Sequence, residues 1–111
     1  AYYLSIRNKD LDKAKQMAKK SVEIDPYNSN NLDTYAWVLY KIGNYKSALE
    51  WIEKAYNNSG SSSGVVMEHY GDILYKLNHE SEALKFWKLA RQQSDFSELL
   101  DKKIQDKKLY E

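Results

Sequence analysis

The chain has 111 residues, of which 17 are lysine or arginine and 16 are aspartate or glutamate, with a net charge of +1. This length fits one domain, and because acidic and basic residues are interspersed without a basic block, the sequence does not indicate nucleic-acid binding. The absence of cysteine excludes disulfides, thiolate metal sites and a cysteine nucleophile. No apolar run approaches the ~20 residues that cross a bilayer, so we expect no direct membrane insertion.

Apolar residues recur with helical spacing along the chain, and there is a single proline. The pattern predicts seven helices, at residues 1–8, 10–24, 30–42, 45–57, 65–77, 80–93 and 96–110. Lys9-Asp10 is the predicted turn between the first two helices, and Gly43-Asn44 is expected to stop the third. The serine- and glycine-rich run 57–64 predicts a flexible surface loop.

The last predicted helix has the features of a polar cap. Asp95 followed by Glu98 fits a capping box at its start, and Leu100 and Ile104 form a narrow apolar stripe. The residues expected to face outward from this stripe are Lys102, Lys103, Asp106 and Lys107.

Three alanines show that the helical pattern repeats. Ala14, Ala48 and Ala83 are separated by 34 and then 35 residues. Each is followed four positions later by an expected core residue (Ala18, Ile52 and Trp87) and seven positions later by a small residue (Ser21, Ala55 and Ala90). A period in this range is typical of a solenoid built from stacked repeats.

These residues resemble the tetratricopeptide repeat (TPR) family, whose unit is a pair of antiparallel helices in 34 residues. The middle unit matches at Leu32, Tyr35, Ala36, Leu39, Gly43, Tyr45, Ala48, Ile52 and Ala55, and the next unit matches at Met67, Tyr70, Gly71, Leu74, Ala83, Trp87 and Ala90. The resemblance implies an all-α fold, an α-α superhelix with a C-terminal capping helix, as one domain over 1–111. We expect a truncated first repeat at 1–28, repeats at 29–63 and 64–95, and the capping helix at 96–111.

A narrower resemblance concerns the runs 33–43 and 68–77, which are similar to the C-terminal part of longer bacterial proteins of this family. Those proteins are commonly exported or associated with the outer membrane. The resemblance therefore implies a periplasmic or outer-membrane-associated location, with the cytoplasm as the alternative.

The two histidines, His69 and His79, do not indicate a catalytic or metal site. His69 lies beside Glu68 and one turn from Asp72, but adjacent residues point about 100° apart around a helix, and no second histidine follows at the fourth position. No nucleophile stands with a base and an oxyanion site. We expect no enzyme activity, no metal and no cofactor.

The resemblance implies a protein or peptide partner, because the first helix of each unit in this family lines a concave groove. The groove positions that we expect to contact a partner are Tyr3, Arg7, Asp33, Trp37, Tyr40, Lys41, Glu68, Asp72, Tyr75 and Lys76. Asp33 and Glu68 stand where some members carry the basic or amide groups that grip a terminal carboxylate, so we expect a polar-apolar segment rather than such a tail. The aromatic side chains are alternatively explained by packing between neighbouring units.

A second hypothesis is structural. The surface of residues 1–24 that would meet a preceding unit carries Tyr2, Leu4 and Ile6 and lacks a polar cap. This predicts end-to-end self-association, as a homodimer through the first repeat. The chain would then be a spacer or oligomerisation segment without a ligand of its own.

Overall fold

The computed structural model describes residues 2–58, 63–93 and 95–109, and the side chains from Asp12 onward. The described regular structure is entirely α-helical. The helices are α1 (Tyr2–Ile24), α2 (Ser29–Ile42), α3 (Tyr45–Asn57), α4 (Gly64–Lys76), α5 (Glu80–Arg91) and α6 (Leu100–Asp106). None of them combines the length and apolarity needed to span a membrane.

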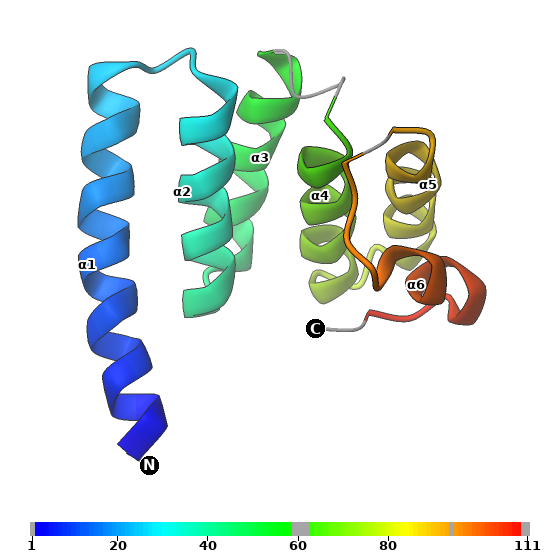
Figure 1. The fold of residues 1–111 in the computed structure, drawn as a ribbon, viewed down its shortest axis with the longest axis horizontal. Helices are drawn as coiled ribbons and strands as arrows, with labels where there is room; N and C mark the ends of the chain where they lie inside the picture. Colours follow the sequence, from blue (N-terminus) through cyan, green and yellow to red (C-terminus); the bar gives the residue numbers. More distant parts are fainter. Residues whose placement is uncertain (1, 59–62, 94, 110–111) are drawn as a thin grey trace.

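The helices form a layered array in which each one packs against the next along the chain (Figure 1). Helices α2 and α3 make one antiparallel pair and α4 and α5 make the next, and α2 also contacts α4 across the pairs. This arrangement confirms the predicted all-α solenoid. The short helix α6 packs on α5 and lies at one end of the α4–α5 pair (Figure 1).

The ends of α2 and α4 follow from local sequence signals. Asn28 caps α2 by accepting a hydrogen bond from the N–H of Asn31 at 3.1 Å. Gly43 ends α2 with a φ of +97°, a left-handed conformation that glycine adopts without a steric penalty. The predicted stop at Gly43 is therefore confirmed. Ser63 caps α4 through the N–H of Val66.

The first two predicted helices are one continuous helix, so the expected turn at Lys9-Asp10 is wrong. Neither residue is glycine or proline, and both are tolerated inside a helix, so nothing in this stretch stops α1. Consequently, the part of the chain expected to fold back as a separate helix extends α1 instead (Figure 1).

The last predicted helix is shorter than expected, because α6 begins at Leu100 and the capping box at Asp95 is wrong. The Asp95 carboxylate instead accepts hydrogen bonds from the N–H of Gly64 at 2.8 Å and the hydroxyl of Ser63 at 3.0 Å. It therefore serves the unpaired donors at the start of α4. The slight burial of Asp95 acts to raise its pKa, but these hydrogen bonds outweigh that effect and leave the pKa below its ordinary value.

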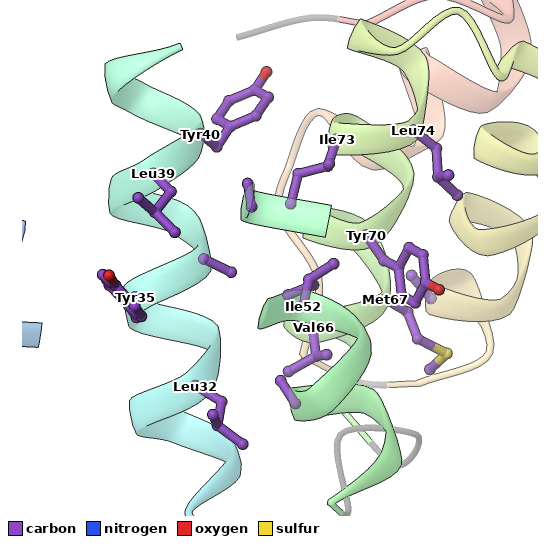
Figure 2. Packing of buried hydrophobic residues seen from close by; sticks show 14 of the residues in the cluster. Leu32, Tyr35, Leu39, Tyr40, Ile52, Val66, Met67, Tyr70, Ile73 and Leu74 are labelled. Atoms are coloured by element: carbon purple, nitrogen blue, oxygen red, sulfur yellow. The ribbon is translucent and has the colours of Figure 1, made fainter. Parts of the chain in front are cut away.

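The small residues of the repeat lie at the centre of the helix pairs. Ala48, Ala55, Ala83 and Ala90 are completely buried, as is Ile52, and Trp87 is almost so. Figure 2 shows members of this core on α2, α3 and α4. Small side chains at these contacts let the helix axes approach closely, which supports the packing expected from the alanine spacing.

Candidate functional site

A pocket of about 320 Å³ lies between α2, α4 and the residues that follow α5. Its lining consists of Trp37, Lys41, Val65, Glu68, His69, Asp72, Phe96, Ser97, Leu99 and Lys103. Four of the predicted groove residues are therefore brought together here: Trp37, Lys41, Glu68 and Asp72. They meet because α2 and α4 are the first helices of successive pairs and lie against each other.

An aromatic stack joins the two helices at one wall of this α2–α4 pocket. The ring of Trp37 stacks on His69 with centroids 3.9 Å apart and on Tyr40 at 4.7 Å. The ammonium of Lys41 lies 5.0 Å from the Trp37 centroid, which is a cation–π distance. Trp37 is half-buried and Lys41 is exposed, so this wall offers both an apolar surface and a positive charge.

The histidine in the stack also holds one of the predicted groove residues. Nδ1 of His69 lies 2.8 Å from Oδ1 of Asp33, so the imidazole donates a hydrogen bond to the carboxylate across the α2–α4 contact. Asp33 therefore has an internal partner, and His69 links α2 to α4 both by stacking and by this bond.

The pocket lining also contains two buried carboxylates, Glu68 and Asp72, one turn apart on α4. They are only 4% and 3% exposed. Lys103 of α6 donates from Nζ to Glu68 at 2.8 Å and to the two oxygens of Asp72 at 2.9 and 3.0 Å. Trp87 donates its indole N–H to Asp72 at 3.0 Å. Ser97 donates its backbone N–H to Glu68 at 2.8 Å, and its hydroxyl donates to the other Glu68 oxygen.

Burial and hydrogen bonding act in opposite directions on these two carboxylates. At Asp72, burial dominates and raises the pKa to about 6, although Lys103 and Trp87 act to lower it. At Glu68, burial also acts to raise the pKa, but the bonds from Lys103 and Ser97 outweigh it and lower the pKa below its ordinary value. At neutral pH two carboxylates therefore share one ammonium, which leaves the cluster with a net negative charge.

Among the remaining predicted groove residues that the structure describes, Asp33, Tyr40, Tyr75 and Lys76 lie outside the lining of the α2–α4 pocket. Tyr40 is buried between the rings of Trp37 and Tyr45, and half-buried Tyr75 stacks on Trp87 with centroids 5.8 Å apart. Lys76 is exposed. The side chains of Tyr3 and Arg7 lie outside the described residues.

Sequence reasoning missed the contribution of the chain after α5. Lys103, which we expected to face solvent, is 3% exposed, so that expectation is wrong. Its place three residues after buried Leu100 puts it on the same side of α6, where the α4 carboxylates compensate its charge. The three-residue spacing from Leu100 was the sequence signal that could have placed Lys103 on the buried side of α6. Phe96, Ser97 and Leu99 precede α6 in a stretch that we expected to be helical, and the sequence pattern did not place them against α4.

An array of antiparallel helix pairs with small residues at the contacts defines a tetratricopeptide-type solenoid. A family model described as anaphase-promoting complex, cyclosome, subunit 3 matches residues 7–88. The match covers most of the chain, and the chain belongs to this family, which is of the tetratricopeptide type.

Solved structures with the same fold are distant in sequence. One is the first TPR of Spaghetti (RPAP3) bound to the HSP90 peptide SRMEEVD, with a TM-score of 0.81, 16% identity and coverage of 92% of this chain and 80% of that chain. Another is Naa15/Naa10 bound to HypK-THB, with a TM-score of 0.73, 17% identity and coverage of 89% of this chain. This chain spans only 15% of the length of that second chain. A comparison with curated protein sequences finds no significant match.

Proposed function

We propose that this chain is a non-enzymatic interaction module that binds a peptide or protein segment in the α2–α4 pocket. The observation that carries the proposal is the wall formed by Trp37 and Lys41, where a half-buried indole lies beside an exposed ammonium at the mouth of a pocket of about 320 Å³. Aromatic rings with a polar edge are frequent energetic centres of protein interfaces. Both similar structures named above contain a bound peptide or protein, which supports a role of this class.

The proposed contact residues follow from the same geometry. Trp37 and Lys41 would meet the partner directly, and Glu68 and Asp72 line the same pocket. Tyr3, Arg7, Asp33, Tyr40, Tyr75 and Lys76 remain proposed contacts for a longer segment that extends along the first helices of the repeats. We retain repeat boundaries of 1–28, 29–63 and 64–95, with 96–111 as the cap, as part of this proposal.

Selection from a displayed peptide library, followed by calorimetry, tests the proposal. We expect selected peptides to bind the wild-type chain and to lose at least tenfold in affinity when Trp37 and Lys41 are both changed to alanine. The matched control changes Trp51 and Lys54 to alanine, because the Lys54 ammonium lies 4.1 Å from the Trp51 ring on α3, outside this pocket. Equal binding to all three proteins would contradict the proposal.

A spacer or oligomerisation segment is the second candidate. Its supporting observation is the exposure of three large apolar side chains on and after α1: Met17 at 72%, Ile24 at 76% and Tyr27 at 76%. A homodimer through the first repeat would cover such side chains. Sedimentation velocity over a wide concentration range tests this candidate, and a monomer throughout would exclude it.

A further inference from the structure

The chain carries a docked segment on the same α4 surface that forms one wall of the pocket. Residues 95–109, here called the C-terminal segment, pass beside α4 before and within α6 (Figure 1). Two side chains of this segment, Ser97 and Lys103, donate hydrogen bonds to Glu68, and Lys103 also bonds Asp72. The segment therefore shows which chemistry this surface accepts, namely a hydroxyl and an ammonium six residues apart.

The surface needs a cation in this position. A buried carboxylate without a partner is strongly unfavourable, so removing one member of a buried ion pair is strongly destabilising. Glu68 and Asp72 are both nearly inaccessible, and among the residues that the structure describes Lys103 is the cation within hydrogen-bond distance of both. Any other segment that takes this place must therefore bring a positive charge of its own.

The helix that supplies Lys103 has little stability by itself. α6 has only seven residues, whereas isolated helices shorter than ~12–15 residues are marginal in water. Its N-terminus has no side-chain capping bond. The burial of Leu100, the bonds of Lys103 and an ion pair between Asp101 and Arg91 of α5 hold it in place. A second segment can reproduce the first two of these interactions.

The pocket brings a second segment next to the carboxylates, which Lys103 covers. Glu68 and Asp72 line it together with Trp37 and with Val65, which is 38% exposed. A segment that enters the pocket therefore finds an apolar surface and the two carboxylates in the same lining.

We propose that the α4 surface is a receptor for a partner segment that presents a lysine next to an apolar side chain, and that the C-terminal segment is its internal occupant. The partner lysine takes the place of Lys103 between Glu68 and Asp72, while the apolar side chain contacts Trp37 and Val65. This inference rests on the proposed function, because it names the partner class for the same pocket. It predicts selection against acidic segments, which would leave the carboxylates unpaired.

A peptide of residues 95–109, added to the complete chain, tests the inference by fluorescence anisotropy. We expect the peptide to bind the Lys103→Met chain at least tenfold more tightly than the wild-type chain, because the internal occupant has lost its cation. In the peptide, Lys103→Gln should lower the affinity at least tenfold. The matched control is the peptide with Lys102→Gln, which changes an exposed lysine on the same helix and should bind like the unchanged peptide.

Equal binding of the Lys103→Gln and Lys102→Gln peptides would overturn the inference. Should the Lys103→Met chain fold poorly, the same two peptides are compared on the wild-type chain, where binding is weaker but the same preference is expected. Changing Glu68 to Gln and Asp72 to Asn must abolish that preference, and its persistence would also overturn the inference. If the preference is absent while library peptides still depend on Trp37 and Lys41, this inference fails and the proposed function stands.

Discussion

The groove faces of α2 and α4 carry residues at equivalent positions that have different environments. Asp33 and Trp37 on α2 correspond, 35 residues later, to Glu68 and Asp72 on α4. On α2, half-buried Trp37 lines the pocket, whereas the Asp33 carboxylate lies outside the lining and is held by His69. The α4 pair is buried beneath Lys103. The repeat position places a residue on the groove face, but the segment that lies over that face decides whether the residue is accessible.

The interiors of the two helix pairs differ at two positions, where a smaller residue on one helix accompanies a larger residue on the other. Ala36 and Ile52 in the first pair correspond to Gly71 and Trp87 in the second. A Cβ at Gly71 would lie 2.5 Å from the Trp87 indole, so the larger ring occupies the space that a methyl group fills in the first pair. The exchange has a consequence for the site, because the same indole donates a hydrogen bond to Asp72.

The largest expected difference between the two faces is in the pH dependence of stability. Burial raises the pKa of Asp72 to about 6, so the folded chain keeps a proton that the unfolded chain loses near pH 4. The contribution of this group to the free energy of unfolding must therefore fall as pH rises from about 4 to about 6. We expect the stability of the wild type relative to Asp72→Asn to drop by about 3 kcal/mol over this range. Urea unfolding at a series of pH values measures it.

Glu68 provides a control in which stability is expected to change with pH in the opposite direction. Its pKa is lowered, mainly because the bonds of Lys103 and Ser97 outweigh burial, so its stabilising contribution is lost as pH falls through the acidic carboxyl range. Stability relative to Glu68→Gln should accordingly decrease toward low pH. For the Asp72 prediction, the contradicting outcome is that the stability of the wild type and that of Asp72→Asn change in parallel with pH. Burial would then not raise the pKa of Asp72.

The next largest effect is expected inside the helix pairs. Gly71→Ala should destabilise the chain by about 2 kcal/mol, because the added methyl collides with the buried Trp87 ring and this outweighs the better helix propensity of alanine. Adding Trp87→Ile recreates the Ala36–Ile52 combination of the first pair and should recover part of the loss. A double-mutant cycle in urea measures the coupling, and strictly additive effects would contradict the proposed compensation.

The repeat pattern was sufficient to predict most of the fold. The alanine spacing and the left-handed Gly43 placed α2, α3, α4 and α5 to within a few residues. The family resemblance implied groove positions for Trp37 and Asp72, and both line the same pocket. These features are readable because they depend on contacts within one or two turns or between successive units.

The part of the site that was not predicted from the sequence depends on contacts between residues far apart in the chain. Lys103 reaches carboxylates 31 and 35 residues earlier in the chain, and Ser97 reaches Glu68 across 29 residues. The direction of the irregular stretch before α6 decides these pairings. Charge composition alone favours a solvent-exposed lysine, because lysine is rarely buried unless it is paired.

The smallest expected effect concerns the link between the two faces. Trp37 on α2 stacks on His69 of α4, and aromatic pairs contribute about 0.5–1.5 kcal/mol beyond their area burial. In a double-mutant cycle of Trp37→Leu and His69→Leu, we expect a coupling energy of about 1 kcal/mol. His69→Phe separates the two roles of the imidazole, because it keeps the stacking and loses the bond to Asp33. If His69→Phe is as destabilised as His69→Leu, the bond to Asp33 rather than the stack holds α2 against α4, and the Trp37 ring is then free to exchange His69 for a side chain of the partner.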